Sequence, residues 1–77
     1  MRHVTFAVWF EKHWLREGEK PTPGMFRLSV DTGITPPTLR RAIVGKPLRA
    51  DTAQRLSDFT GGMVARELLA FGTSAAA

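Results

Sequence analysis

The chain contains no cysteine. This absence excludes a disulfide-stapled scaffold, a zinc site built on thiolates and a cysteine nucleophile. Long apolar segments are also missing, because the longest run covers only residues 6–10 and is closed by Glu11 and Lys12. Such a run is far too short for a membrane-spanning helix or for the hydrophobic part of a signal peptide. We therefore expect a cytoplasmic protein.

The length of 77 residues leaves room for one small domain. At that length folding buries only about 60–65% of the surface of the unfolded chain, so the core is small. Hydrophobic residues make up 43% of the chain, which is typical of a globular domain and too high for a disordered segment. We expect a single domain over residues 1–72, followed by a flexible C-terminal tail at residues 73–77 that has nothing to bury.

Positive charge is in excess and is concentrated in the middle of the chain. The formal net charge is +4, from 11 Lys and Arg against 7 Asp and Glu. Residues 24–49 alone carry a net charge of +4, and the stretch 36–49 contains four basic residues and no acidic one. Such a stretch is either a solvated surface or a site that attracts a polyanion.

Glycine and proline divide the chain into short helical segments. Thr5 is placed to cap a first helix, and Gly33 is placed to end a second one in the left-handed conformation. Thr35 is a good N-cap for a third helix, because proline is favoured at the position that follows. The expected helices cover residues 6 to 16 or 17, 25–32, 36–44, 49–59 and 64–71. The fold is predicted to be all-α, although residues 4–10 also alternate in a way that suits an edge strand.

Residues 25–32 and 36–44 form two short helices around a tight turn, which is the helix-turn-helix arrangement. The turn glycine is preceded by a leucine and a small residue, and is followed by an apolar residue, a hydroxyl, a second apolar residue and a glycine-basic pair: Leu28, Ser29, Gly33, Ile34, Thr35, Leu39, Gly45 and Lys46. Over about residues 24–70 the chain resembles the Cro/CI-type helix-turn-helix proteins of bacteriophages and their bacterial relatives.

The resemblance implies a lambda-repressor-like domain of five short helices that binds double-stranded DNA. It further implies a nucleoid-associated transcriptional regulator, a repressor that binds an inverted-repeat operator as a homodimer, without a cofactor and without enzymatic activity. In such proteins the second helix of the motif enters the major groove. The DNA-binding residues expected on this basis are Arg27, Thr35, Pro36, Pro37, Thr38, Arg40, Arg41, Lys46 and Arg49.

The sequence departs from the family pattern in the first turn of the second motif helix. Pro36 and Pro37 stand where family members usually have polar side chains that read base edges. Proline donates no hydrogen bond, so these two residues are limited to apolar contacts, for example with a thymine methyl group. Base reading then shifts to Thr38 and the two arginines that follow, of which Arg41 is suited either to bidentate contact with guanine or to plain phosphate contact. Arg27 is expected to supply a phosphate contact from the first motif helix.

Residues that could carry catalysis or bind a metal are few. His3 lies near the N-terminus, and His13 has Glu17 four positions further on but no third ligand. We interpret His13 as a residue at the edge of the core or at an interface. The sequence therefore predicts no enzyme, no metal site and no cofactor.

The chain carries more apolar surface than one small core needs. Val8 and Leu15 would fall on the opposite side of the first helix from Phe6 and Phe10, and they form one possible interface with a partner. The last helix carries the preferred homodimer interface, since Leu68 and Leu69 cannot both face the same core. The interface residues expected there are Val64, Leu68, Leu69 and Phe71.

Two other functions would also account for apolar surface in excess of the core. The first is a protein-interaction module on the same scaffold, such as an antitoxin, for which DNA binding is a secondary function. An apolar patch left exposed and a copurifying protein would favour it. A membrane anchor formed by the first helix is the least favoured, because the polar edge of that helix carries both signs of charge.

Overall fold

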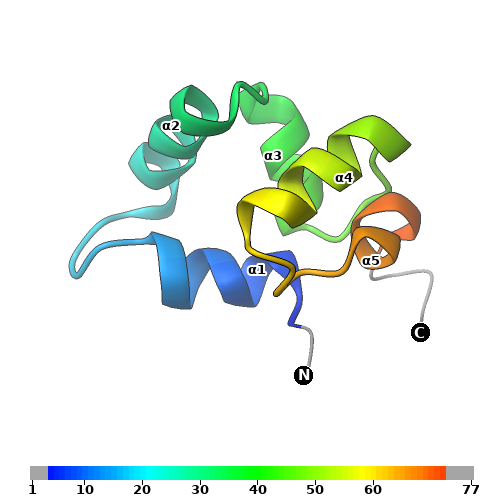
Figure 1. The fold of residues 1–77 in the computed structure, drawn as a ribbon. Coiled ribbons are helices and arrows are strands. Elements are labelled where there is room, and N and C mark those ends of the chain that lie inside the picture. Colours follow the sequence, from blue (N-terminus) through cyan, green and yellow to red (C-terminus); the bar gives the residue numbers. More distant parts are fainter. Residues whose placement is uncertain (1–3, 73–77) are drawn as a thin grey trace.

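Residues 4–72 are described by the computed structural model, and they form five α-helices, one π-helical turn and no strand (Figure 1). The elements are α1 (Phe6–Trp9), η1 (Phe10–Trp14), α2 (Pro21–Thr32), α3 (Pro36–Ile43), α4 (Ala50–Phe59) and α5 (Arg66–Phe71). The predicted all-α fold of five short helices is confirmed, and the alternating residues 4–10 do not form an edge strand. His3 and the predicted tail at residues 73–77 lie outside the described residues. Within residues 4–72, no helix combines the length and the apolar composition that crossing a membrane requires.

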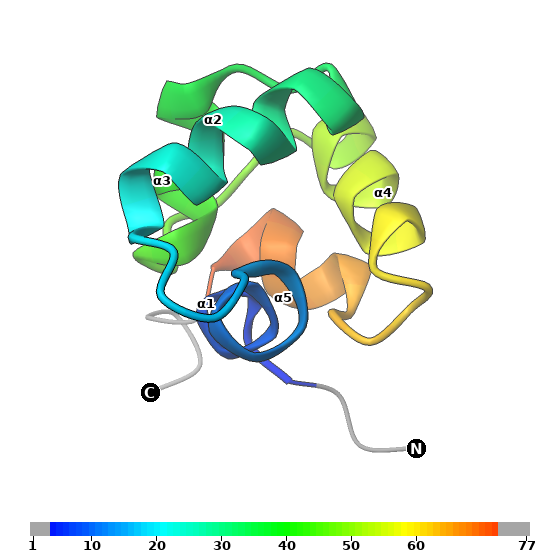
Figure 2. The same cartoon turned by 90° about the vertical axis from the view of Figure 1, so that its left-hand side faces the viewer.

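The helices enclose an apolar core. Figure 1 shows α1 and η1 along one side of the molecule, with α2, α3 and α4 opposite them and α5 at one end. In Figure 2, which looks along α1, the other helices form an arc over α1 and α5. The residues beneath the helix-turn-helix are all buried: Leu28, Ile34, Leu39, Ala42 and Leu56. The aromatic residues Phe6, Trp9 and Phe10 of the first helix are buried with them.

The first helix begins as predicted and ends early. The hydroxyl of Thr5 accepts a hydrogen bond from the N–H of Val8 at 3.2 Å, which caps α1. From Phe10 onward the helix widens to a π-helical turn, since the N–H of Leu15 donates to the carbonyl of Phe10 at 2.9 Å. The helix therefore ends at Trp14 rather than at residue 16 or 17.

Helix α2 begins at Pro21, four residues before its predicted start. The predicted start at residue 25 is therefore wrong. The first N–H groups of any helix have no partner within the helix, so Pro21 and Pro23 cost the helix no hydrogen bond. Gly24 lies inside α2, where the helix approaches Leu15 so closely that a Cβ atom would overlap its side chain. This close approach seats the start of α2 on the end of the first helix.

Candidate nucleic-acid interface

Three residues, Gly33, Ile34 and Thr35, join α2 to α3. Gly33 has the left-handed conformation (φ 74°, ψ 12°), and its N–H donates to the carbonyl of Ser29 at 2.9 Å. Ile34 is 5% exposed and anchors the turn in the core, while its carbonyl accepts a hydrogen bond from the Ser29 hydroxyl at 2.6 Å. The turn therefore has the connection length, the glycine conformation and the buried apolar anchor that the sequence predicts for it.

Helix α3 has one side in the core and the other in solvent. Leu39 and Ala42 are 0% and 6% exposed. At about 100° per residue, the positions opposite this buried side are those of Pro37 and Arg41, and both residues are exposed. Arg40 is exposed beside them. The solvent side of α3 is therefore apolar in its first turn and basic in its second.

The first turn of α3 presents few hydrogen-bond donors. Thr35 has the backbone conformation of an N-cap (φ −66°, ψ 150°), but its hydroxyl makes no capping bond to the helix backbone. Instead its oxygen lies 3.0 Å from the hydroxyl oxygen of Thr38, and the two hydroxyls share a hydrogen bond. Pro36 and Pro37 occupy the first two helical positions and have no N–H. The surface of this turn thus consists of proline rings and a pair of mutually bonded hydroxyls.

The side chain of Arg41 is restrained by a hydrogen bond to the connection that follows α3. Its Nη2 donates to the carbonyl of Pro47 at 3.0 Å, which bridges the helix and the connection to α4. The N–H of Lys46 donates in turn to the backbone carbonyl of Arg41 at 2.9 Å. Arginine has five N–H donors, so Arg41 keeps donors for a bidentate contact while its orientation is restrained.

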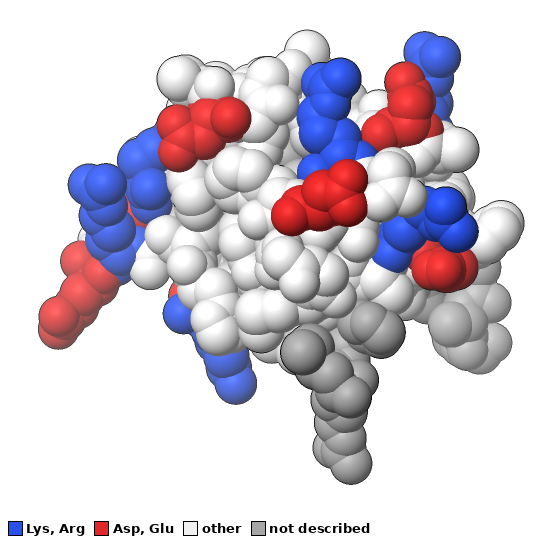
Figure 3. Space-filling model, viewed as in Figure 1, with Lys and Arg blue, Asp and Glu red and all other residues white. Residues whose placement is uncertain are grey.

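The four basic residues of α3 and its connection to α4 are all exposed: Arg40, Arg41, Lys46 and Arg49. We call these residues the basic segment. Arg49 lies 3.8 Å from Asp51, but the two side chains are 88% and 76% exposed, so this ion pair is weak and solvated. The face shown in Figure 3 carries mixed charge, with acidic side chains beside basic ones. The structure thus groups these four predicted site residues on one helix and the loop after it.

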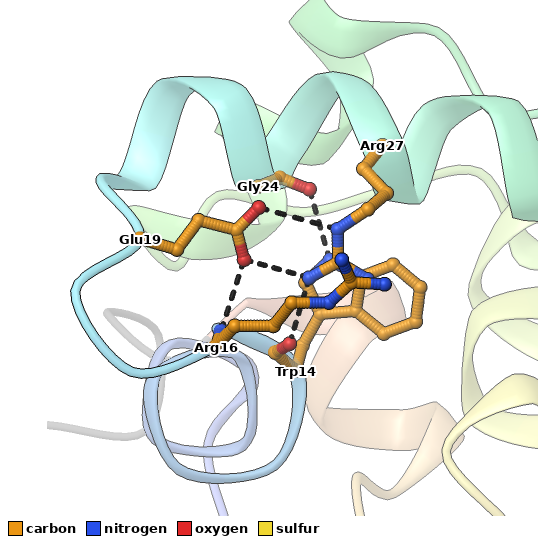
Figure 4. A network of polar contacts seen from close by, with 5 residues as sticks. All are labelled: Trp14, Arg16, Glu19, Gly24 and Arg27. Atoms are coloured by element: carbon orange, nitrogen blue, oxygen red, sulfur yellow. Dashed lines mark hydrogen bonds and ion pairs between the residues drawn. The ribbon is translucent and has the colours of Figure 1, made fainter.

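Arg27 lies in a different environment from the other candidate arginines (Figure 4). Its Nη2 donates to Glu19 Oε1 at 2.7 Å and to the carbonyl of Trp14 at 2.9 Å, and its Nε donates to Glu19 Oε2 at 3.2 Å. The guanidinium carbon also stands 4.3 Å from the centre of the Trp14 ring, whose indole N–H donates to the carbonyl of Gly24 at 2.9 Å. These bonds tie η1, the following loop and α2 together. Arg27 is therefore a structural residue here, and we no longer assign it a phosphate contact.

Because of this network, the fold is expected to lose stability at acid pH. The hydrogen bond from Arg27, followed by the one from the N–H of Arg16, lowers the pKa of Glu19 from 4.5 to about 2. Because the pKa is lower in the folded state, the stabilising contribution is complete above pH 4.5 and is lost as the pH falls toward 2. We expect the Tm of the wild type to fall more steeply over that range than the Tm of Glu19→Gln.

Thermal unfolding followed by circular dichroism in steps of pH measures this difference. Glu11→Gln, which removes an exposed carboxylate of η1, is the matched control and should follow the wild-type curve. Parallel curves for the wild type and Glu19→Gln would show that the ion pair does not contribute to stability.

The residues predicted to form a homodimer interface fall into two groups. Val64 is 0% exposed and Leu69 is 3% exposed, so the prediction that they face a second chain is wrong. Leu69 belongs to the core because α5 packs on α4 and on the loop before α4, where the N–H of Leu48 donates to the carbonyl of Leu69 at 2.9 Å. Val64, between α4 and α5, is part of the same core. Leu68 is half-buried, whereas Phe71 is 68% exposed.

An open groove between α4 and α5 lies beside Phe71. It has a volume of about 470 Å³ and is lined by the apolar Ala50, Ala70 and Phe71, by the charged Asp51, Arg66 and Glu67, and by Gln54. The alternative interface on the first helix is interrupted. Val8 is 37% exposed, but Leu15 lies beyond the helix end and packs against the core. The α5 surface is therefore the more extended apolar surface of the two.

Sequence reasoning missed one apolar patch. Phe26 and Val30 lie one turn apart on α2 and are 51% and 83% exposed. Their spacing of four residues was the available signal, because it places both side chains on one side of the predicted helix 25–32. His13, interpreted as a residue at the core edge or an interface, is exposed on η1.

No three His, Asp or Glu side chains of residues 4–72 come close enough together to hold a metal ion. Comparison of the chain with models of protein families, with curated protein sequences and with solved structures gives no match, so its function is inferred from its own geometry.

Proposed function

We propose that this protein is a sequence-specific double-stranded DNA-binding regulator, a transcriptional repressor that acts at the nucleoid in the cytoplasm. The observation that carries the proposal is the solvent side of α3, which follows a glycine turn after α2 and continues into an acid-free basic segment. A helix held in this way fits the major groove of DNA, and exposed basic side chains beside it neutralise phosphates.

The basic residues of the proposed interface are assigned either to base edges or to phosphates. Arg41 has an exposed guanidinium whose orientation is restrained by Pro47, and it is assigned a base contact. Arg40, Lys46 and Arg49 are assigned to phosphates, because they flank the exposed side of α3 or follow it in the connection to α4.

A homodimer on an inverted repeat completes the proposal. One recognition helix reads only a few base pairs, and a single small module buries about 600–1,000 Å² on DNA, which is little for tight specific binding. Two-fold symmetry doubles the contact and places the two recognition helices about 34 Å apart. Phe71, Leu68 and the groove between α4 and α5 are the surface assigned to this dimer.

The salt dependence of binding tests the proposal most directly. If a dimer engages about six phosphates, log K should fall with log salt concentration with a slope of about −5. The measurement is a fluorescence-anisotropy titration at several salt concentrations, with a duplex from just upstream of the gene and a random-sequence duplex of equal length. The upstream duplex should bind more tightly at every salt concentration. A slope near zero, or no binding at low salt, would remove DNA as the partner.

The exposed Phe26 and Val30 favour a second candidate function, a protein-interaction module such as an antitoxin. Copurification of a defined second protein from the source cells, lost in a double Phe26→Ser, Val30→Ser variant that keeps its helical content, would support it.

A further inference from the structure

The chemistry of the first turn of α3 limits which base edge it can accept. Pro37 is exposed at the centre of the solvent side of α3 and lacks an N–H. The neighbouring hydroxyls of Thr35 and Thr38 are bonded to each other, which uses one of their two protons. This turn therefore presents an apolar ring where a helix would otherwise present polar groups to DNA.

The major groove contains one kind of apolar group on its base edges. Guanine, adenine and cytosine present acceptors or donors there, whereas thymine also presents its C5-methyl group. A proline ring pressed on an N7, O6 or N4 group would remove that group from water without giving it a hydrogen bond, which is unfavourable. Pressed on a methyl group, the same ring removes apolar surface from water on both sides, which is favourable.

The ring of Pro37 has a fixed conformation in the free protein. Proline has no rotatable side chain, and its φ angle is set by the ring, so the contact loses almost no conformational entropy on binding. Arg41 follows one helical turn later on the same side of α3 and is restrained by the carbonyl of Pro47 at 3.0 Å. The two residues thus form a rigid apolar position followed by a cationic side chain with a restrained orientation.

We propose that Pro37 reads the C5-methyl group of a pyrimidine in the major groove, so that the protein distinguishes 5-methylpyrimidines from unmethylated ones at one position of each half-site. The proposal rests on the proposed function. The shared ligand is the methyl group, which thymine and 5-methylcytosine both carry at the same place on the ring.

The experiment begins with selection of wild-type binding sites from a random duplex pool at low salt. The selected duplex is then synthesised with each thymine replaced in turn by uracil, which removes only the methyl group. We expect one thymine per half-site at which this change weakens binding about fourfold, the effect of a single buried methyl group. Replacing the thymine–adenine pair there by 5-methylcytosine–guanine, compared with cytosine–guanine, shows whether a methyl group on cytosine is also read. A fourfold preference for the methylated cytosine supports recognition of the methyl group itself. Equal binding overturns the reading of 5-methylcytosine and leaves thymine as the base that is recognised.

Pro37→Ala is the decisive variant, because alanine suits the second helical position and leaves the basic segment unchanged. We expect it to bind the thymine and uracil duplexes equally while it keeps wild-type helical content. Pro21→Ala, which removes an exposed proline from the first turn of α2, is the matched control and should keep the fourfold preference.

The outcomes separate this proposal from the proposed function. Specific binding by the wild type without any effect of uracil overturns the methyl reading and leaves DNA recognition intact. A methyl preference that survives in Pro37→Ala assigns the reading to another residue and overturns the role of Pro37. Failure to enrich any sequence, or absence of binding at low salt, overturns the proposed function and this inference together.

Discussion

Leu69→Glu is expected to unfold the protein, whereas Phe71→Glu is expected to leave it folded. Leu69 is 3% exposed in the core and Phe71 is 68% exposed on the same short helix. An unpaired carboxylate in the position of Leu69 combines lost packing with the burial of a charge, a loss of about 4 kcal/mol or more. A domain of this length has a total stability of only about 4–12 kcal/mol. Circular dichroism and urea titration of the two variants measure the difference.

Phe71→Glu then tests the assigned dimer surface. We expect monomers in sedimentation equilibrium, unchanged helical content and loss of tight binding to the inverted repeat, since two carboxylates would meet across a two-fold axis. Ala70→Ser is the control, because Ala70 is half-buried in the same helix and lines the same groove, and the change is small. This variant should remain dimeric. A dimer that persists in Phe71→Glu would place the interface elsewhere, and a folded Leu69→Glu would contradict the burial of Leu69.

Arg41→Ala and Arg49→Ala are expected to weaken DNA binding in different ways. Loss of the base contact of Arg41 should weaken binding to the selected site by about 1–3 kcal/mol for each subunit, roughly a 5-fold to 150-fold rise in Kd per contact, and relax discrimination at one base position of each half-site. Arg49 is 88% exposed in its side chain and is assigned to phosphate. Its loss should weaken specific and random duplexes by the same smaller factor and reduce the magnitude of the salt slope by about two, because a homodimer loses one phosphate contact from each subunit.

Anisotropy titrations against the selected duplex, single-base variants of it and random DNA provide the comparison. Arg41→Lys keeps the charge but not the planar fork, so it should resemble Arg41→Ala in specificity while keeping the salt slope of the wild type. Arg55→Ala, an exposed arginine of α4 outside the basic segment, is the control for a general loss of charge. Equal losses on all duplexes for Arg41→Ala would assign specificity to DNA shape.

Local signals in the sequence were sufficient to predict the turn between α2 and α3. Gly33 adopts the left-handed conformation, Thr35 takes the N-cap position before α3, and Ile34 is buried between them. Each of these features depends on residues within a few positions, namely on backbone freedom, proline at the first helical position and apolar periodicity. The all-α class and the core beneath α3 were predictable for the same reason. So was the cluster of exposed basic residues at 40–49, because they are neighbours in the chain.

Only the tertiary structure decided which side chains of these helices contact one another and which are buried. Glu19, Arg27 and Trp14 follow no helical or strand spacing, and they meet because the end of η1 packs against α2 at Gly24. Leu69 rather than Phe71 is buried because α5 docks on α4 and on the loop that follows α3. Backbone conformation depends mainly on local sequence, so the sequence was sufficient to place the candidate DNA-binding helix. Burial depends on which surfaces pack together, so only the tertiary structure separates the core residues from those in ion pairs and those available to an interface.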